Sequence, residues 1–135
     1  VYPAEELLAF LSEPDYIVCV LPDTPDTRGL ISGEAIAHMK EGCYLVNVGR
    51  GSVLDEDALA AALNEGWLAG AALDVFQTEP LPASSPLWHA RGALLTAHIA
   101  AHSHPRDITA IFVDNFRRFG TGQALRYRVD FKRGY

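Results

Sequence analysis

The sequence lacks the features of a membrane protein and of a disulfide-stapled secreted domain. Its longest apolar runs, such as residues 16–21, are far shorter than the roughly 18 residues of a membrane-spanning helix. It has two cysteines, too few for a disulfide framework, and each lies in an apolar run. We therefore expect Cys19 and Cys43 to be buried free thiols in a reducing, cytoplasmic compartment, with no membrane partner.

The amino-terminal residues also lack the basic and apolar regions of a signal peptide. They include no initiator methionine, so we expect the chain to begin inside a longer protein.

Acidic and basic residues are unevenly distributed along the chain. The net charge is −6, yet six of the eleven basic residues lie between Arg117 and Arg133, where the only acidic residue is Asp130. A basic tail can bind nucleic acid. We expect instead that it docks on an acidic partner surface or a neighbouring subunit, and we predict no nucleic-acid partner.

Apolar, strand-like runs alternate with short helical patterns. A continuous apolar run such as residues 15–21 is typical of a strand buried on both faces of a parallel sheet. The clearest helical pattern, residues 55–64, begins with acidic residues and is followed by Gly66. The alternation predicts a parallel, doubly wound α/β sheet. The expected helices are residues 5–12, 32–40 (with Ser32 as N-cap), 55–64 and 105–119, and the expected strands are 15–21, 43–48, 68–75 and 93–96.

Charged side chains follow three of the expected strands. Arg50 follows the second strand, Asp74 and Glu79 follow the third, and His98 follows the fourth. Because ligands bind at the carboxyl ends of the strands in an open parallel sheet, we expect these four side chains to share one edge.

These residue types suit the reduction of a small 2-keto acid. An arginine can hold a carboxylate through two parallel hydrogen bonds, and a histidine can donate a proton to the ketone oxygen. Glu79 could orient His98 and favour its protonated form, and Asp74 could hold the cofactor. Each residue also fits an ordinary role: a surface ion pair for Arg50, a turn or cap for Asp74, a solvated loop position for Glu79 and a core position for His98.

Two other kinds of site receive little support. His98, His102 and His104 could bind zinc only if they lay on one helix, and they flank a strand end and a proline, so we predict no metal site. The dinucleotide-binding fingerprint Gly-x-Gly-x-x-Gly is absent, because Leu54 stands where a third glycine would follow Gly49 and Gly51.

Several segments resemble the D-2-hydroxyacid dehydrogenase family. LPDTPDTRGLI resembles its Leu-Pro-x-Thr-x-x-Thr-x-x-Leu-Ile segment, and NVGRG resembles its Asn-x-Ala-Arg-Gly. The stretch from DEDALAAALN through LDVF to EPLP and PLW resembles its long signature, and TAHIA resembles its Thr-Pro-His-Ile. The ending VDFKRGY is similar to that of a subgroup that reduces glyoxylate and hydroxypyruvate.

The resemblance implies a Rossmann-like fold whose first half, with the glycine-rich loop, lies outside this chain. It implies that residues 1–104 form the second half of the dinucleotide-binding domain, and that residues 105–135 dock on a substrate domain or a partner subunit. It also implies a 2-keto or 2-hydroxy acid substrate, NADP or NAD as cofactor with NADP favoured, and a homodimer at full length. The implied catalytic residues are Arg50, Glu79 and His98, and the implied cofactor-binding residues are Leu21, Pro22, Val48, Gly49, Arg50, Asp74 and His98.

Two positions depart from the family pattern. Gly49 replaces the usual alanine, which we expect to loosen the backbone before Arg50, and Ala97 replaces the usual proline before His98. Two alternatives stay open: a non-catalytic, NAD(H)-sensing scaffold of the same fold, and an inactive fragment. We expect the chain alone to bind NAD(P)H weakly and to be inactive.

Overall fold

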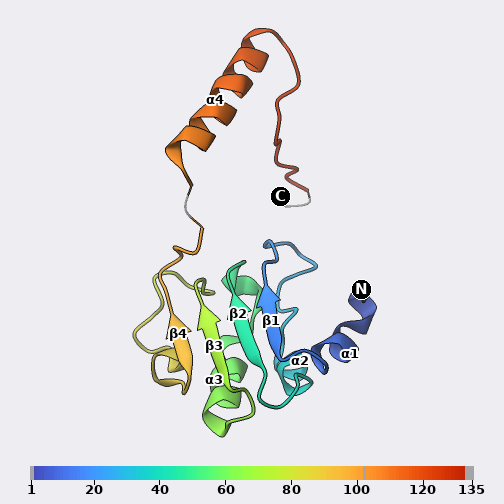
Figure 1. Ribbon diagram of the computed structural model, residues 1–135, viewed down its shortest axis with the longest axis vertical. Helices are drawn as coiled ribbons and strands as arrows, with labels where there is room; N and C mark the ends of the chain where they lie inside the picture. Colours follow the sequence, from blue (N-terminus) through green and yellow to red (C-terminus); the bar gives the residue numbers. More distant parts are fainter. Residues whose placement is uncertain (1, 102, 133–135) are drawn as a thin grey trace. The chain divides into compact units, whose positions relative to one another are not determined.

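The computed structural model describes residues 2–101 and 103–132 and divides into two compact units, residues 1–100 and 101–135 (Figure 1). The first unit contains a four-stranded parallel sheet with the strand order β1-β2-β3-β4. The predicted α/β class with a parallel sheet is therefore confirmed. The strands are β1 (Tyr16–Cys19), β2 (Tyr44–Asn47), β3 (Gly70–Leu73) and β4 (Ala93–Leu95).

Short helices connect the strands of the first unit, and one long helix forms most of the second. The α-helices are α1 (Leu7–Leu11), α2 (Gly33–Ala37), α3 (Glu56–Glu65) and α4 (Pro105–Gly120). There are also three 3-10 helices in the described residues: η1 (Ala4–Glu6) directly precedes α1, η2 (Gly51–Val53) lies between β2 and α3, and η3 (Pro86–His89) lies between β3 and β4.

Local capping signals determine where the helices begin and end. The Asp55 side chain accepts a hydrogen bond from the Ala58 N–H at the start of α3, and Gly66 ends this helix in the left-handed conformation, with φ 82°. Ser32 caps α2 as expected, by accepting from the Ala35 N–H. However, α2 ends at Ala37 rather than near residue 40, because the Lys40 N–H donates to the Leu11 carbonyl oxygen outside the helix.

One face of the sheet packs on the helices and forms the core. Ile17, Cys19, Leu45 and Leu73 point to this face and are at most 6% exposed. They cluster with side chains of all three helices of the first unit, which include Leu11, Ile36, Leu59 and Leu63. Cys19 and Cys43 are buried and free, as predicted.

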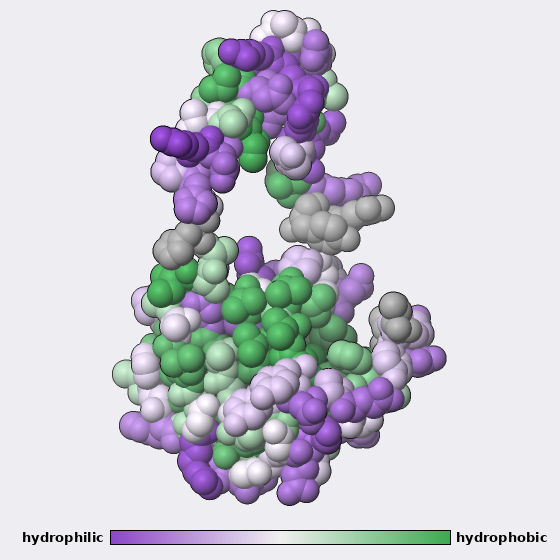
Figure 2. Space-filling view, viewed as in Figure 1, coloured by the Kyte–Doolittle hydropathy of each residue, from purple (hydrophilic) through white to green (hydrophobic). Residues whose placement is uncertain are grey.

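The opposite face of the sheet is apolar and exposed. Tyr16 and Val18 are 69% and 60% exposed, and the rings of Tyr16 and Tyr44 stack with their centroids 5.4 Å apart. The apolar surface over the sheet is visible in Figure 2. The expectation that β1 is buried on both faces is therefore wrong for this chain, because the described helices of the first unit pack on the other face.

The second unit folds its carboxyl-terminal tail back onto α4. The Asn115 side chain accepts from the Arg126 N–H at 2.8 Å and donates to the Arg126 carbonyl oxygen at 3.1 Å. Apolar side chains of α4 remain exposed, namely Ile108, Ile111, Phe112, Phe116 and Phe119. Neither α4 nor any shorter helix in the described segments combines the length and apolar character needed to cross a membrane.

Shortening a buried side chain of α3 should lower the free energy of unfolding strongly. Leu59 is 0% exposed, so Leu59→Ala removes buried methyl groups and leaves a cavity. We expect the free energy of unfolding, measured by urea denaturation, to fall by about 2–5 kcal/mol. Ala61→Ser on the exposed side of the same helix is the control and should change it by less than about 0.5 kcal/mol. Similar losses in the two variants would contradict the assignment of this core.

Candidate active site

The loops after β1 and β2 touch through their backbones at the carboxyl edge of the sheet. A Cβ atom added to Gly49 would lie 2.6 Å from the Leu21 carbonyl oxygen and 2.7 Å from the Leu21 nitrogen. Gly49 is buried at this contact. The structure thus brings together four residues predicted to bind the cofactor, namely Leu21, Pro22, Val48 and Gly49.

Asn47, which the sequence analysis did not single out, fixes the turn that leads to Arg50. It ends β2 and is 1% exposed. Its side-chain oxygen accepts from the Gly49 N–H, and its side-chain nitrogen donates to the Arg50 carbonyl oxygen, both at 3.1 Å. A polar residue that closes an apolar run is the signal that could have identified it, since buried polar groups need partners.

The turn around Arg50 also abuts the loop after β3. A Cβ atom on Gly51 would lie 1.9 Å from the Phe76 carbonyl carbon and 2.4 Å from the Gln77 nitrogen. No side chain fits between these two backbones, so only glycine is compatible with this position. The contact couples the loop that carries Arg50 to the loop that carries Glu79.

Asp74 organises the segment that carries His98. The Asp74 side chain is buried, and it accepts hydrogen bonds from the Thr96 hydroxyl and from the N–H groups of Ile99 and Ala100. Its main-chain carbonyl oxygen accepts from the His98 N–H at 2.8 Å. The pKa of Asp74 lies below its ordinary value. The hydrogen bond from the Thr96 hydroxyl lowers it most, and the bonds from the two N–H groups lower it further.

Glu79 and His98 form a direct pair. The Nδ1 atom of His98 lies 2.8 Å from the Oε2 atom of Glu79, and the other carboxylate oxygen accepts from the Phe76 N–H. The hydrogen bond with His98 lowers the pKa of Glu79 most, and the hydrogen bond from the Phe76 N–H lowers it further. A half-exposed ion pair stabilises a fold by only about 0–1 kcal/mol, so the main effect of this pair is to orient the imidazole.

His98 has a strained backbone, with φ 54°. A residue with a Cβ atom rarely adopts this left-handed conformation, and it costs about 1–3 kcal/mol. The surrounding hydrogen bonds must therefore hold His98 in place.

A cavity of about 510 Å³ lies beside the pair of Glu79 and His98. Apolar side chains, among them Trp88 and Leu95, form most of its wall. Arg50 and Asp74 are not among its lining residues. Within residues 1–100 the structure therefore brings Glu79, His98 and Asp74 together, but it shows no direct contact from Arg50 to them.

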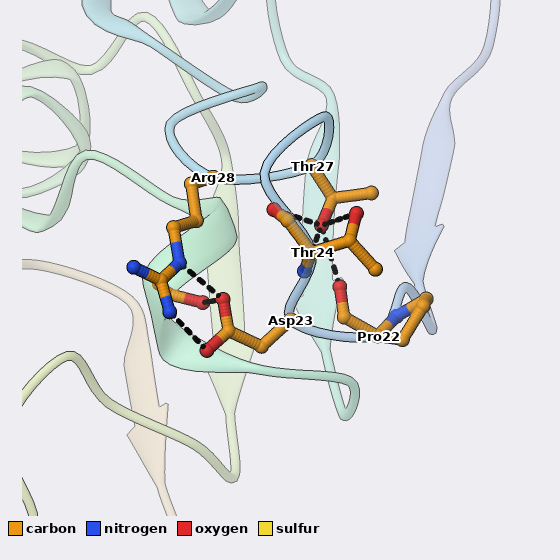
Figure 3. A network of polar contacts seen from close by, with 6 residues as sticks. Pro22, Asp23, Thr24, Thr27 and Arg28 are labelled. Atoms are coloured by element: carbon orange, nitrogen blue, oxygen red, sulfur yellow. Dashed lines mark hydrogen bonds and ion pairs between the residues drawn. The ribbon is translucent and has the colours of Figure 1, made fainter. Parts of the chain in front are cut away.

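The Arg50 side chain is exposed and donates to the Gly49 carbonyl oxygen at 2.7 Å. The neighbouring carboxylate of Asp23 is engaged by Arg28 at 2.7 and 3.0 Å and by the Ser52 hydroxyl at 2.9 Å (Figure 3). Arg28 lowers the pKa of Asp23 most, and the charge of Arg50 adds to this effect. Arg28, rather than Arg50, therefore forms the ion pair with Asp23.

Among the described residues, no group of three or more His, Cys, Asp or Glu side chains could hold a metal ion. His102, one of the three histidines considered for zinc, lies outside the described residues.

The role of Asn47 predicts the cost of its removal. Asn47→Ala leaves the buried Gly49 N–H and the Arg50 carbonyl without their partner, so we expect unfolding to become easier by about 1–3 kcal/mol. Asn64→Ala is the matched control, because Asn64 is exposed and caps only the Arg91 N–H. Equal urea midpoints for the two variants would show that Asn47 does not hold the turn.

Comparison with known proteins identifies relatives of this fold and site. Glyoxylate/hydroxypyruvate reductase A of Escherichia fergusonii is 41% identical over 131 residues, which cover 97% of this chain and 42% of that protein. The corresponding reductase of Citrobacter koseri is 40% identical, over 98% of this chain and 42% of its own length. The chain thus spans less than half the length of these curated relatives.

Solved structures agree with this result. A D-isomer specific 2-hydroxyacid dehydrogenase from Xanthobacter autotrophicus Py2 has a TM-score of 0.90 at 46% identity, covering 97% of this chain and 54% of its own. A glyoxylate/hydroxypyruvate reductase from Sinorhizobium meliloti has a TM-score of 0.89 at 36% identity, covering 99% and 44%. Residues 1–100 match the family described as D-isomer specific 2-hydroxyacid dehydrogenase, NAD binding domain, and the chain belongs to this family.

Proposed function

We propose that this chain forms part of an oxidoreductase that transfers a hydride between NAD(P)H and a small 2-keto acid, giving the 2-hydroxy acid. The pairing of Glu79 with His98, 2.8 Å apart at the carboxyl edge of the sheet, carries the proposal. A histidine oriented by a carboxylate can hold a proton and deliver it to an oxygen that gains negative charge. The family of the chain supports the same chemistry.

His98 is the proton donor in reduction and the proton acceptor in oxidation. Its Nδ1 atom faces Glu79, so Nε2 is the nitrogen left to face the substrate oxygen. Glu79 orients the ring and stabilises the imidazolium. The short distance between the two side chains keeps the proton-bearing ring in one orientation during the reaction.

Arg50 binds the substrate carboxylate. Its guanidinium can form two parallel hydrogen bonds with a carboxylate. These bonds balance the negative charge of the carboxylate and also fix the position of the adjacent ketone carbon. The turn that Asn47 and Gly51 hold fixes the backbone position of Arg50, from which its side chain extends. We infer that the substrate lies between Arg50 and His98, because the backbone contact at Gly51 joins the loop of Arg50 to the loop of Glu79, and Glu79 pairs with His98.

The cofactor, when bound, supplies or accepts the hydride. The backbone around Leu21, Pro22, Val48 and Gly49 lines the cofactor cleft in this proposal, and the close approach of Gly49 to Leu21 supports this placement. Contact between Asp74 and the nicotinamide end of the cofactor stays a prediction. The Xanthobacter relative was crystallised with NADPH and the Sinorhizobium relative with NADP, which supports NADP over NAD for this chain.

The relatives also suggest the substrate and the assembly. The curated relatives are reductases of glyoxylate and hydroxypyruvate, and we propose these two acids as substrates. We further propose that residues 105–135 dock on a substrate domain or a partner subunit of a cytoplasmic homodimer. The exposed apolar side chains of α4 support such docking, because they lack cover within the described part of the second unit.

Substitutions at Arg50 and His98 test the proposed roles. In the full-length polypeptide, we expect His98→Ala to lower kcat for glyoxylate by about 10²–10⁴-fold, since it removes the proton donor. Arg50→Ala should lower kcat/KM by about 10–100-fold, since a charge-assisted hydrogen bond is worth about 1.5–3 kcal/mol. Arg91→Ala, on an exposed loop, is the control. Keto-acid reduction that survives both active-site changes would favour the non-catalytic, NAD(H)-sensing scaffold.

The chain of 135 residues should be nearly inactive by itself. Its sequence has no glycine-rich loop to hold the cofactor phosphates, so we expect weak NADPH binding and negligible turnover. The decrease in absorbance at 340 nm with NADPH and glyoxylate measures turnover, and a melting curve with and without NADPH measures binding. Steady turnover by this chain would refute the expectation.

A further inference from the structure

The backbone of His98 needs an explanation beyond its pairing with Glu79. Its φ of 54° places a residue with a large side chain in the left-handed region. Such a conformation persists only where the surroundings hold it. Ala97, which precedes His98, has no ring to restrict the chain, so the constraint must come from hydrogen bonds.

The backbone N–H groups of His98, Ile99 and Ala100 all donate to one residue, Asp74. The N–H groups of Ile99 and Ala100 donate to the Asp74 carboxylate at 2.9 and 2.8 Å, and the His98 N–H donates to the Asp74 carbonyl oxygen at 2.8 Å. Successive N–H groups that converge on one acceptor form an anion-binding concavity, and a left-handed residue is a usual part of it. The anion here is the chain's own carboxylate.

The location of Asp74 favours an internal role. It is 4% exposed and does not line the cavity beside His98. Its position is fixed in turn, because the Asp74 N–H donates to the Asn47 carbonyl oxygen at 3.0 Å at the end of β2. Because the Asp74 backbone is fixed to the sheet, its carboxylate can hold the backbone of residues 98–100 in a fixed position relative to the sheet.

We propose that Asp74 is a positioning residue whose ionised carboxylate holds His98 in its left-handed conformation and so directs the imidazole onto Glu79, before any cofactor binds. The proposal deepens the proposed function, because it rests on His98 as the proton donor. The Asp74 side chain acts through the backbone of residues 98–100. It is distinct from the predicted contact of Asp74 with the nicotinamide end, which could act only when the cofactor is present.

The experiment follows Glu79 in the cofactor-free chain. In the unsubstituted chain the pKa of Glu79 is lowered by His98, so this pKa reports whether the imidazole is in place. In Asp74→Asn, the new NH₂ group cannot accept an N–H, and the imidazole should leave Glu79. We expect the Glu79 pKa, followed by the side-chain carboxyl ¹³C shift, to rise toward the ordinary value of about 4.3. The Ile99 and Ala100 amide hydrogens should exchange at least about tenfold faster, as hydrogen-bonded amides do once released.

Two further variants make the result decisive. Asp55→Asn removes another carboxylate that accepts a backbone N–H, at the start of α3, and should leave the Glu79 titration unchanged. Thr96→Val removes one partner of Asp74 while keeping its charge, and should produce a smaller shift of the same sign. If Asp74→Asn does not fold, the shift in Thr96→Val decides the question. A Glu79 pKa that stays at its original value in every folded Asp74 and Thr96 variant overturns the proposal.

Kinetics of the full-length polypeptide separate this proposal from the proposed function. A positioning role predicts that Asp74→Asn lowers kcat while the Kd for NADPH stays within about twofold, whereas a pure nicotinamide contact would weaken NADPH binding. Since the Glu79 titration involves no turnover, it can succeed even if the substitutions at Arg50 and His98 leave activity intact. In that case only the catalytic assignment fails.

Discussion

The candidate site depends on main-chain contacts between loops that leave neighbouring parallel strands. Strands in a sheet lie about 4.8 Å apart, so loops that continue past their ends at this spacing have no room for a side chain between them. Gly49 against Leu21 and Gly51 against Phe76 are the two points where this limit applies. Because Arg50 lies between these two glycines, its backbone position is set by the sheet on both sides.

Such loops contain main-chain groups that the hydrogen bonds of the sheet no longer pair, and two polar side chains supply partners for them. Asn47 pairs with groups of Gly49 and Arg50, and Asp74 pairs with the N–H groups of Ile99 and Ala100. Buried N–H and carbonyl groups that lack partners are costly, so each side chain stabilises the fold and the local geometry together. The fold and the proposed chemistry therefore use the same hydrogen bonds.

The sequence predicts the features that depend on local interactions or on topology. The cap of α2 at Ser32 and the end of α3 at Gly66 were predictable because capping involves only nearby residues, and the pairing of Glu79 with His98 followed from the meeting of strand ends. The exposure of Val18 was not predictable, because it depends on what packs on the second face of the sheet. The left-handed His98 was missed as well, since no turn residue such as glycine or asparagine marks it.

The two departures from the family pattern have different physical consequences. A Cβ at position 49 would overlap the Leu21 backbone, so the close approach between the loop after β1 and the turn of Arg50 in this chain requires glycine at this position. At position 97 the loss of proline removes one restriction on the residue before it. The hydrogen bonds to Asp74 act on residues 98–100 and involve no atom of residue 97, so they can hold His98 with either residue. The site is therefore more sensitive to a change at Gly49, where backbones meet, than at Ala97.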